Sequence, residues 1–188
     1  SKKIKNKFKP IKILEIGSND GVFLKNFNKK NIIGVEPCKN LAKITKAKGY
    51  KTYTEYWNMK LSKKITQKNK IDLIYSANTL SHIKDISSIF KAINFALSKN
   101  GILILEDPSL LECMRKNAYD QFYCEHIYVF STIALQKILK NFGLEIFDIE
   151  KTSTHGGSNR YYIKRCNDNF YEIKQSVKNN VKAEKKYG

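Results

Sequence analysis

Residues 11–36 form the segment that most constrains what this chain can fold into. Ile13-Leu14-Glu15-Ile16 is an apolar run with one acid, and it leads directly into Gly17-Ser18-Asn19-Asp20-Gly21. A second apolar run, Ile32 to Val35, ends at Glu36. Two such runs joined through a glycine-containing turn are typical of a βαβ unit in a parallel sheet. A carboxylate at the end of the second strand is placed to accept hydrogen bonds from ribose hydroxyls, so the segment predicts a nucleoside site.

The residues of the turn favour S-adenosylmethionine over a dinucleotide. A dinucleotide site uses the pattern G-x-G-x-x-G so that a pyrophosphate can bind at the helix N-terminus, whereas Gly17 is followed here by Ser18, Asn19 and Asp20. A carboxylate in the turn suits a sulfonium and an ammonium group better than a pyrophosphate. The alternative is an ordinary strand-to-helix turn that contains a glycine. The cofactor interpretation predicts these binding residues: Glu15, Gly17, Ser18, Asn19, Asp20, Gly21, Glu36, Pro37 and Asn78.

Size and composition fit one α/β domain with a core of its own. The chain has 188 residues and 41% of them are hydrophobic. No apolar stretch approaches the roughly 20 residues of a membrane span, and Ser1-Lys2-Lys3 lacks the apolar region of a signal peptide. The 4 cysteines are scattered without a C-x-x-C pair, which gives no indication of a metal or redox site. We expect a cytoplasmic protein with no membrane partner and no metal, unless a targeting segment has been removed.

The strongly basic charge raises nucleic acid as a partner. The formal net charge is +18, but most of the excess is lysine spread along the whole chain, and the arginines are Arg115, Arg160 and Arg165. Lysine lacks the planar fork that reads base edges, and enrichment of lysine, asparagine and isoleucine together is typical of AT-rich coding. We interpret the charge as a solvated lysine surface that favours small polyanions such as nucleotide sugars. An RNA or DNA target is the second hypothesis.

Apolar periodicity predicts strands that alternate with helices. Strands are expected at residues 11–16, 32–36, 51–53, 71–77 and 101–106, and helices at residues 22–28, 41–48, 59–67 and 85–97. After an irregular aromatic stretch over 110–130, Ser131 caps a helix that runs to Phe142 and stops at Gly143, and residues 145–151 and 160–165 close as a strand pair. This order predicts an α/β fold with a doubly wound, mostly parallel seven-stranded sheet of the class I methyltransferase type.

The sequence also predicts how the chain divides into parts. Residues 1–10 are a basic lead-in or linker remnant, residues 11–166 are the methyltransferase domain, and residues 167–188 are a C-terminal helical extension that leaves the domain. Ligands of doubly wound sheets bind beyond the carboxyl ends of the strands. One crevice is therefore expected to gather the first turn, Glu36, residues 76–82 and residues 106–109.

Two motifs in the second half of the chain are more specific than the turn. They are Tyr123-Cys124-Glu125-His126, within residues 119–131, and His155-Gly156-Gly157-Ser158, within residues 154–160. In these motifs, and in the same order from Lys12 to Lys164, the chain resembles the sugar C-methyltransferases that act on nucleotide-linked ketosugars. The resemblance implies methyl transfer to a ring carbon next to a ketone, with these residues at matching active-site positions: Tyr123, Glu125, His126 and His82.

The chain also departs from that family. Its members usually carry a cysteine-rich zinc domain before the methyltransferase core and another α/β domain after it, and neither is present in this sequence. The chain is then one domain of a longer protein or a reduced member. Many relatives have a second histidine at the position of Cys124, whose role stays open.

Carbon methylation needs the residue types that these motifs offer. A carbon acid beside a ketone has a high pKa, so a base must take its proton and donors must stabilise the enolate oxygen. We expect His126 to be the base, because a neutral imidazole is basic near pH 7. Glu125 is expected to be its partner or a substrate hydroxyl contact, and Tyr123 and His82 are expected to be enolate donors.

Each assignment has a structural alternative. His126 could be an interfacial histidine, and Tyr123 could be a core aromatic. Residues 155–158 could be a turn rather than an amide-rich loop that binds the sugar or diphosphate. Tyr56 and Trp57 could stack on adenine or cover the sheet edge. The functional interpretation predicts these substrate-binding residues: Asn78, His155, Gly156, Gly157 and Ser158.

The predicted function is S-adenosylmethionine-dependent C-methylation of a nucleotide-linked 4-keto-deoxysugar at the carbon next to the ketone. An O- or N-methyltransferase acting on a small molecule or RNA is one alternative, since it needs no base for a carbon acid. A non-catalytic cofactor-binding domain of a larger protein is the other. The sequence leaves open the sugar, the nucleotide, the methylated position and the oligomeric state.

Overall fold

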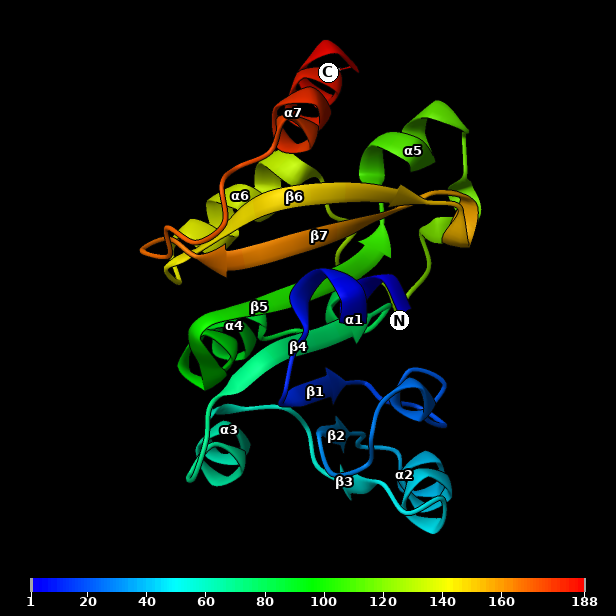
Figure 1. Cartoon of the computed structure of the whole chain (residues 1–188). Helices are drawn as coiled ribbons and strands as arrows, with labels where there is room; N and C mark the ends of the chain where they lie inside the picture. The colour runs from blue at the N-terminus through cyan, green and yellow to red at the C-terminus, as the bar shows by residue number, and fades with distance from the viewer. Residues whose placement is uncertain (1, 188) are drawn as a thin grey trace.

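All seven predicted strands are present in the structure, although the one predicted at residues 101–106 spans Leu97–Pro108 and the one predicted at residues 11–16 begins at Ile13. The computed structural model describes residues 2–187, although not the side chains of Lys2 and His155. The first half of the chain contributes β1 (Ile13–Ile16), β2 (Ile32–Val35), β3 (Lys51–Tyr53) and β4 (Ile71–Ala77). The second half contributes β5 (Leu97–Pro108), β6 (Leu144–Thr152) and β7 (Ser158–Arg165) (Figure 1). Strands β1 and β2 are buried along their whole length because other elements cover both of their faces.

The strands form one seven-stranded sheet in the order β3-β2-β1-β4-β5-β7-β6. Neighbouring strands run parallel except for β7, which pairs antiparallel with both β5 and β6. The register places Ile16 beside Val35 on one side and beside Ser76 on the other, so three carboxyl ends meet at the same edge. These findings confirm the predicted doubly wound, mostly parallel sheet.

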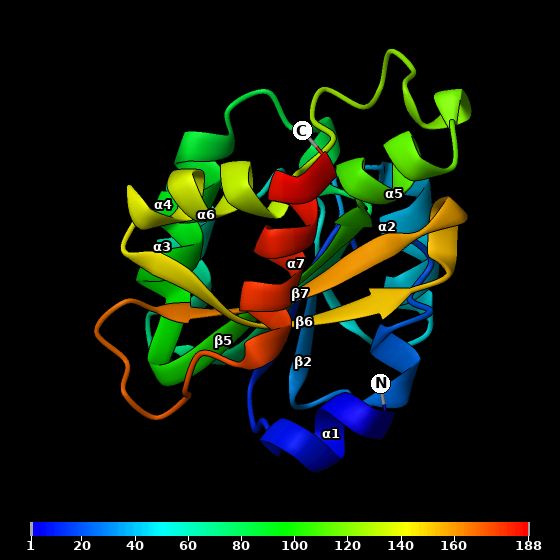
Figure 2. The ribbon, with the colours of Figure 1, turned by 90° about the horizontal axis from the view of Figure 1, so that it is seen from above.

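Helices cover the sheet on both faces (Figure 2). On one face α3 (Met59–Ile65), α4 (Ile86–Ala96) and α6 (Thr132–Lys140) pack over a large apolar core. On the other face α1 (Lys2–Phe8) and the 3-10 turn η1 (Leu24–Asn26) cover a smaller and more aromatic core. Helix α2 (Lys39–Ala47) packs beside β3. No helix among residues 2–187 combines the length and the apolar composition needed to cross a membrane.

Side-chain caps set the starts of three helices. Asn58 accepts a hydrogen bond from the Leu61 N–H, Asp85 from the Ser88 N–H, and Ser131 from the Ala134 N–H. Such caps satisfy backbone donors that have no partner within the helix. The cap at Ser131 confirms the predicted start of α6. The helix ends at Lys140, two residues before the predicted end at Phe142, and Gly143 follows with a positive φ.

The helix expected at residues 22–28 is reduced to the turn η1. The Asn26 side chain explains the difference, because its amide donates to the Val22 and Phe23 carbonyls at 2.9 and 3.1 Å. Those carbonyls would otherwise accept from the backbone of a continuing helix. The stretch predicted as irregular also contains a helix, α5 (Leu110–Arg115), and a 3-10 turn, η3 (Tyr119–Gln121).

Both end segments pack on the sheet domain. In α1, Ile4 is buried and the Phe8 ring lies 5.6 Å from the ring of Tyr162. The C-terminal helix α7 (Gln175–Tyr187) packs on β6 and α6, so the expectation that it leaves the domain is wrong. Polar groups hold it there, since the Glu184 carboxylate accepts from the N–H groups of Thr132 and Ile133 at 2.6 and 2.9 Å. The domain boundaries at residues 11 and 166 stay a prediction.

Candidate active site

The turn after β1 requires glycine at its first position. Gly17 has φ +75, and a Cβ there would lie 2.2 Å from Thr79 Oγ1. The N–H groups of Gly17 and Ser18 both donate to the Val35 carbonyl, which ties the turn to the end of β2. A side chain at position 17 would therefore collide with Thr79.

Glu36 is fixed in place by backbone amides. Its Oε2 accepts from the Asn19 N–H at 2.8 Å, and its Oε1 accepts from the Cys38 N–H at 2.9 Å. The residue is only 6% exposed. Each carboxylate oxygen keeps a further lone pair, so the group can accept hydrogen bonds from a ligand without losing its own support.

A cavity of about 580 Å³ opens at this edge of the sheet. The turn, the end of β2, the segment after β3 and the segment after β4 all contribute to its wall. Its lining residues are Ile16, Gly17, Asn19, Val35, Glu36, Pro37, Leu41, Tyr56, Trp57, Asn78, Thr79, His82, Ile83 and Glu125. Five predicted cofactor residues are therefore in the wall, namely Gly17, Asn19, Glu36, Pro37 and Asn78. The wall does not include the other predicted ones: Glu15, Ser18, Asp20 and Gly21.

His126 is held in a single tautomer. Its Nδ1 lies 2.8 Å from the Gln121 carbonyl oxygen, and its Nε2 lies 2.9 Å from the Tyr123 hydroxyl. A carbonyl oxygen only accepts, so Nδ1 carries the proton. Nε2 then has the free lone pair and accepts from the Tyr123 hydroxyl. The imidazole is therefore oriented with its basic nitrogen toward a polar partner that a ligand could replace.

The second histidine lies beside the first. His82 ends the 3-10 turn η2 (Leu80–His82), and its ring centroid is 4.9 Å from that of His126. His82 and Glu125 line the cavity, whereas Tyr123 and His126 do not. The His126 ring lies against that of His82, and the Tyr123 ring lies 4.1 Å from that of His126. Among the described residues Glu125 makes no hydrogen bond to His126. The Gln121 carbonyl takes the place that a partner carboxylate was expected to fill.

The His-Gly-Gly-Ser loop lies away from the cavity. It forms η4 (Thr154–Gly156), and the Gly157 carbonyl accepts from the Ser109 N–H at 3.1 Å. The Thr154 hydroxyl donates to Glu106 at 3.1 Å. None of the residues 156–158 lines the cavity, so their assignment to the substrate site stays a prediction that the cavity wall does not support.

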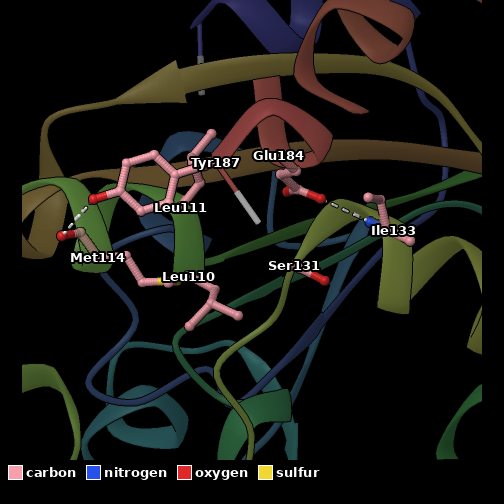
Figure 3. Close-up of a pocket in the computed structure, with 7 residues that line it drawn as sticks. All are labelled: Leu110, Leu111, Met114, Ser131, Ile133, Glu184 and Tyr187. Atoms are coloured by element: carbon pink, nitrogen blue, oxygen red, sulfur yellow. Dashed lines mark hydrogen bonds between the residues drawn. The ribbon is translucent and has the colours of Figure 1, made fainter. Parts of the chain in front are cut away.

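A second hollow lies between α5 and α7 (Figure 3). It measures about 280 Å³ and shares no lining residue with the larger cavity. Its lining residues are Leu110, Leu111, Met114, Ser131, Ile133, Glu184 and Tyr187. The Tyr187 hydroxyl donates to the Met114 carbonyl at 3.2 Å, and Glu184 binds the start of α6. This hollow is a consequence of how α7 docks, and the larger cavity is the candidate active site.

Comparison with known proteins identifies the family. The sequence matches the family described as "Methyltransferase domain" over residues 2–149. The protein belongs to this family. It is 28% identical over 149 residues to the C-methyltransferase NovU of Streptomyces niveus, a match that covers 78% of this chain and 36% of NovU. The chain thus spans about a third of the length of this relative.

Solved methyltransferase structures share the fold. The O-methyltransferase of a trans-AT PKS multienzyme of Brevibacillus brevis has a TM-score of 0.65 at 14% identity, with 95% of this chain and 73% of that chain covered. An S-adenosylmethionine-dependent methyltransferase of Clostridium acetobutylicum has a TM-score of 0.64 at 16% identity, covering 87% and 88%. By family and fold the chain is a methyltransferase domain, which confirms the predicted fold class, and the solved structures that share the fold include S-adenosylmethionine-dependent methyltransferases.

The cavity of this methyltransferase domain has chemistry that fits the cofactor. Asn78 Oδ1 and Trp57 Nε1 are buried and have no hydrogen-bond partner among the described residues. Both residues line the cavity, so each can serve a ligand that arrives there. Apolar side chains such as Ile16 and Leu41 supply the surface that a purine ring needs. Trp57, whose role the sequence left undecided, is 4% exposed and belongs to the wall.

The acids around the turn fit a cationic ligand. Burial, followed by the nearby charges of Glu36 and Asp20, raises the pKa of Glu15 to about 9. Glu15 Oε2 has no hydrogen-bond partner among the described residues. An ammonium or sulfonium charge nearby would relieve this repulsion and favour the ionised carboxylate. The acids Glu15, Asp20 and Glu36 thus favour a ligand that carries a positive charge.

Proposed function

We propose that the protein methylates a nucleotide-linked 4-keto-deoxysugar at the ring carbon next to the ketone. The observation that carries the proposal is the arrangement of His126, whose Nδ1–H is fixed on the Gln121 carbonyl while Nε2 lies beside the Tyr123 hydroxyl and the His82 ring. A methyltransferase for oxygen or nitrogen needs no such base for a carbon acid. The name of the relative NovU, a C-methyltransferase, supports the same class of reaction.

Residues of the cavity wall would hold the cofactor. Glu36 would accept from the ribose hydroxyls, and the open backbone at Gly17 and Asn19 would lie against the methionine part of the molecule. Trp57 and the apolar wall would enclose the adenine, with the indole N–H as a donor. When bound, S-adenosylmethionine supplies a methyl group on a positively charged sulfur.

Different residues of the chain would then remove the proton and stabilise the enolate. The His126 Nε2 takes the proton from the ring carbon, and the Gln121 carbonyl stabilises the imidazolium through the Nδ1–H bond. The Tyr123 hydroxyl, released from Nε2, donates to the developing enolate oxygen together with His82. With the cofactor held in the cavity, the enolate carbon would take the methyl group as the methyl–sulfur bond breaks, which would leave S-adenosylhomocysteine. The imidazolium finally returns its proton to water.

Two further features favour this substrate class. The formal net charge of +18 attracts a substrate that carries a diphosphate. Glu125 is exposed and lines the cavity, where its carboxylate would accept from a sugar hydroxyl. Because the chain covers 36% of NovU, we extend the proposal only to the methyltransferase step of residues 11–166.

The test is solvent exchange followed by mass spectrometry. The protein is incubated in deuterated water with a nucleoside diphosphate 4-keto-6-deoxyhexose, first without and then with S-adenosylmethionine. We expect deuterium at the carbon next to the ketone, and then a methyl group at the same carbon. A methyl group found on oxygen or nitrogen of the sugar would overturn the proposal, as would methylation of RNA without any reaction of the sugar.

A further inference from the structure

The glycines of the His-Gly-Gly-Ser loop pack on α5 and not on the cavity wall. The Ser109 N–H, at the start of α5, donates to the Gly157 carbonyl at 3.1 Å. The Lys116 ammonium, at the end of the helix, donates to the Gly156 carbonyl. The loop therefore holds α5 at both of its ends.

Glu112 lies between these two contacts on the same side of α5. Positions 109, 112 and 116 are spaced by three and four residues, so they share one face of a helix. The Glu112 carboxylate accepts from Lys151 of β6 at 3.0 Å. A Cβ at Gly157, where φ is +138, would lie 2.9 Å from the Glu112 Cβ. Only glycine at position 157 therefore allows the loop to approach the helix this closely.

Backbone hydrogen bonds connect α5 to the proposed base. The Ala118 N–H donates to the Cys113 carbonyl of α5 at 2.9 Å, and the Gln121 N–H donates to the Ala118 carbonyl at 3.3 Å. The Gln121 carbonyl in turn accepts from the Nδ1–H of His126. The position of α5 thus sets the position of the carbonyl that fixes the tautomer of His126.

The segment that carries the base depends on α5 for its place. Three of its aromatic side chains, Tyr119, Phe122 and Tyr123, are 78%, 54% and 45% exposed, so they contribute little packing. Helix α5 has only 6 residues and is too short to be stable in isolation. The contacts between α5 and its neighbours must therefore hold both elements.

We propose that the loop of residues 154–158 is a clamp on α5, and that Gly157 and Lys116 are positioning residues for His126. The inference rests on the proposed function, because His126 is the base of that reaction. With α5 held by the clamp, the Gln121 carbonyl keeps the imidazole proton on Nδ1 and leaves Nε2 free to take a proton from the substrate. In this role the glycines of the loop need no contact with the substrate.

The first test compares kinetic constants of variants on both sides of the clamp. We expect Lys116→Met, at an exposed position, to lower kcat about tenfold with KM for the sugar nucleotide unchanged, because a hydrogen bond to a charged group is lost and the base is misplaced. Gly157→Ala should lower kcat at least as much, again without a change in KM. Lys116→Arg keeps a donor and should restore turnover.

A matched control and two outcomes decide the test. Lys140→Met, at an exposed lysine of α6, should keep the wild-type kcat. A wild-type kcat in Lys116→Met would overturn the inference. A raised KM with unchanged kcat in Gly157→Ala would also overturn it, because the loop would then bind the substrate.

A measurement without substrate separates this inference from the proposed function. The nitrogen chemical shifts of the His126 ring in NMR report which nitrogen carries the proton. We expect the proton on Nδ1 in the wild type and in Lys116→Arg, and a mixture of both tautomers in Lys116→Met and Gly157→Ala. If these tautomers are found but the wild type does not exchange the sugar proton, the proposed function fails while the positioning role stands. Wild-type ring shifts in either Lys116→Met or Gly157→Ala would contradict the positioning role whatever the substrate.

Discussion

At the scale of single residues, the candidate active site depends on how backbone groups fix side chains. The Gln121 carbonyl fixes the tautomer of His126, and the amides of Asn19 and Cys38 fix Glu36. Neither support comes from a side chain. Substitution of the functional side chain itself is therefore the cleanest test of each role.

Removal of the proposed base should stop proton exchange and methyl transfer together. We expect His126→Ala and His126→Asn to lower both by about 10²–10⁴-fold, the range typical of a lost general base, with cofactor affinity nearly intact. Exchange rates from mass spectrometry and calorimetric titration of the cofactor check this. Cys124→Ser is the control, because the exposed Cys124 thiol has no step in the scheme. Full exchange in His126→Ala would indicate that His82 or His155 is the base. Loss of exchange in Cys124→Ser would refute the roles assigned within residues 123–126.

Loss of the Glu36 carboxylate should weaken cofactor binding. We expect Glu36→Ala to lose about 1.5–3 kcal/mol of binding free energy, because hydrogen bonds to a charged acceptor disappear. Calorimetry with S-adenosylmethionine or S-adenosylhomocysteine measures the change. Glu36→Gln removes the charge and keeps an acceptor oxygen for only one of the Asn19 and Cys38 amides, so we expect it to lose affinity too, by less than Glu36→Ala. Unchanged affinity in Glu36→Ala would show that Glu36 does not bind the ribose.

Glu15 should make the ligand-free protein less stable as the pH rises. Its pKa is raised in the folded state to about 9 from 4.5, so the folded protein binds more protons than the unfolded chain between these values, and stability falls across that window. Glu15→Gln removes this loss, and we expect it to be more stable than the wild type by up to about 3 kcal/mol at pH 7. Urea unfolding at pH 5 and pH 8 measures the difference. Glu172→Gln, at an exposed position, is the control and should change neither value. Equal pH dependence of Glu15→Gln and wild type would show that Glu15 is ionised when folded.

At the scale of elements, α7 shows how a polar helix joins a core. It buries Val177, and its Glu184 and Asn180 bind the first residues of α6 through hydrogen bonds to Thr132 and Ile133. A carboxylate at the N-terminus of a helix satisfies free N–H groups and interacts favourably with the helix dipole. In this way α7 caps a helix that is distant in sequence.

Loss of this cap should loosen α7. We expect Glu184→Ala to lower the free energy of unfolding by about 1–2 kcal/mol, as for other lost N-terminal caps. Denaturant unfolding measures this, and hydrogen exchange should show faster exchange of the amides of Thr132 and Ile133. Glu172→Ala serves as the control on the exposed approach to α7. Unchanged exchange at Thr132 in the Glu184 variant would mean that the cap contributes nothing.

At the scale of the whole molecule, the excess of lysine governs encounters with polyanions. The formal net charge of +18 is spread over the whole chain and is not concentrated in one segment. Such a surface gives weak attraction that salt screens within about 10 Å at 0.1 M ionic strength. It favours a small diphosphate substrate without specifying a nucleic-acid sequence.

Binding to oligonucleotides should therefore be weak and independent of sequence. We expect affinity for short single strands and duplexes to fall steeply between 50 and 200 mM salt, as in non-specific binding. Fluorescence anisotropy with two unrelated sequences measures this. Sequence-specific binding or methyl incorporation into RNA or DNA at physiological salt would place the substrate in the other class.

The sequence by itself predicted the sheet and the edge of the sheet at which the candidate site lies. Apolar runs such as Ile71 to Ala77 predict buried strands at their observed bounds, because a parallel strand must be covered on both faces. The turn at Gly17 and the acid Glu36 are separated by one βα step, so local chain geometry already brings them to the same edge. These are short-range properties that a residue pattern can express.

Only the tertiary structure decided how distant polar groups meet. The contact between the rings of His82 and His126 and the docking of α7 through Glu184 both join segments that are far apart in the sequence. It also separated residues 156–158 from the cavity wall, although their motif had suggested a place in it. A sequence pattern indicates which side chains are buried, since the preference for burial is a property of each residue type. It does not report hydrogen bonds to backbone groups, because every residue carries the same carbonyl and amide and only the fold selects which of them come into reach.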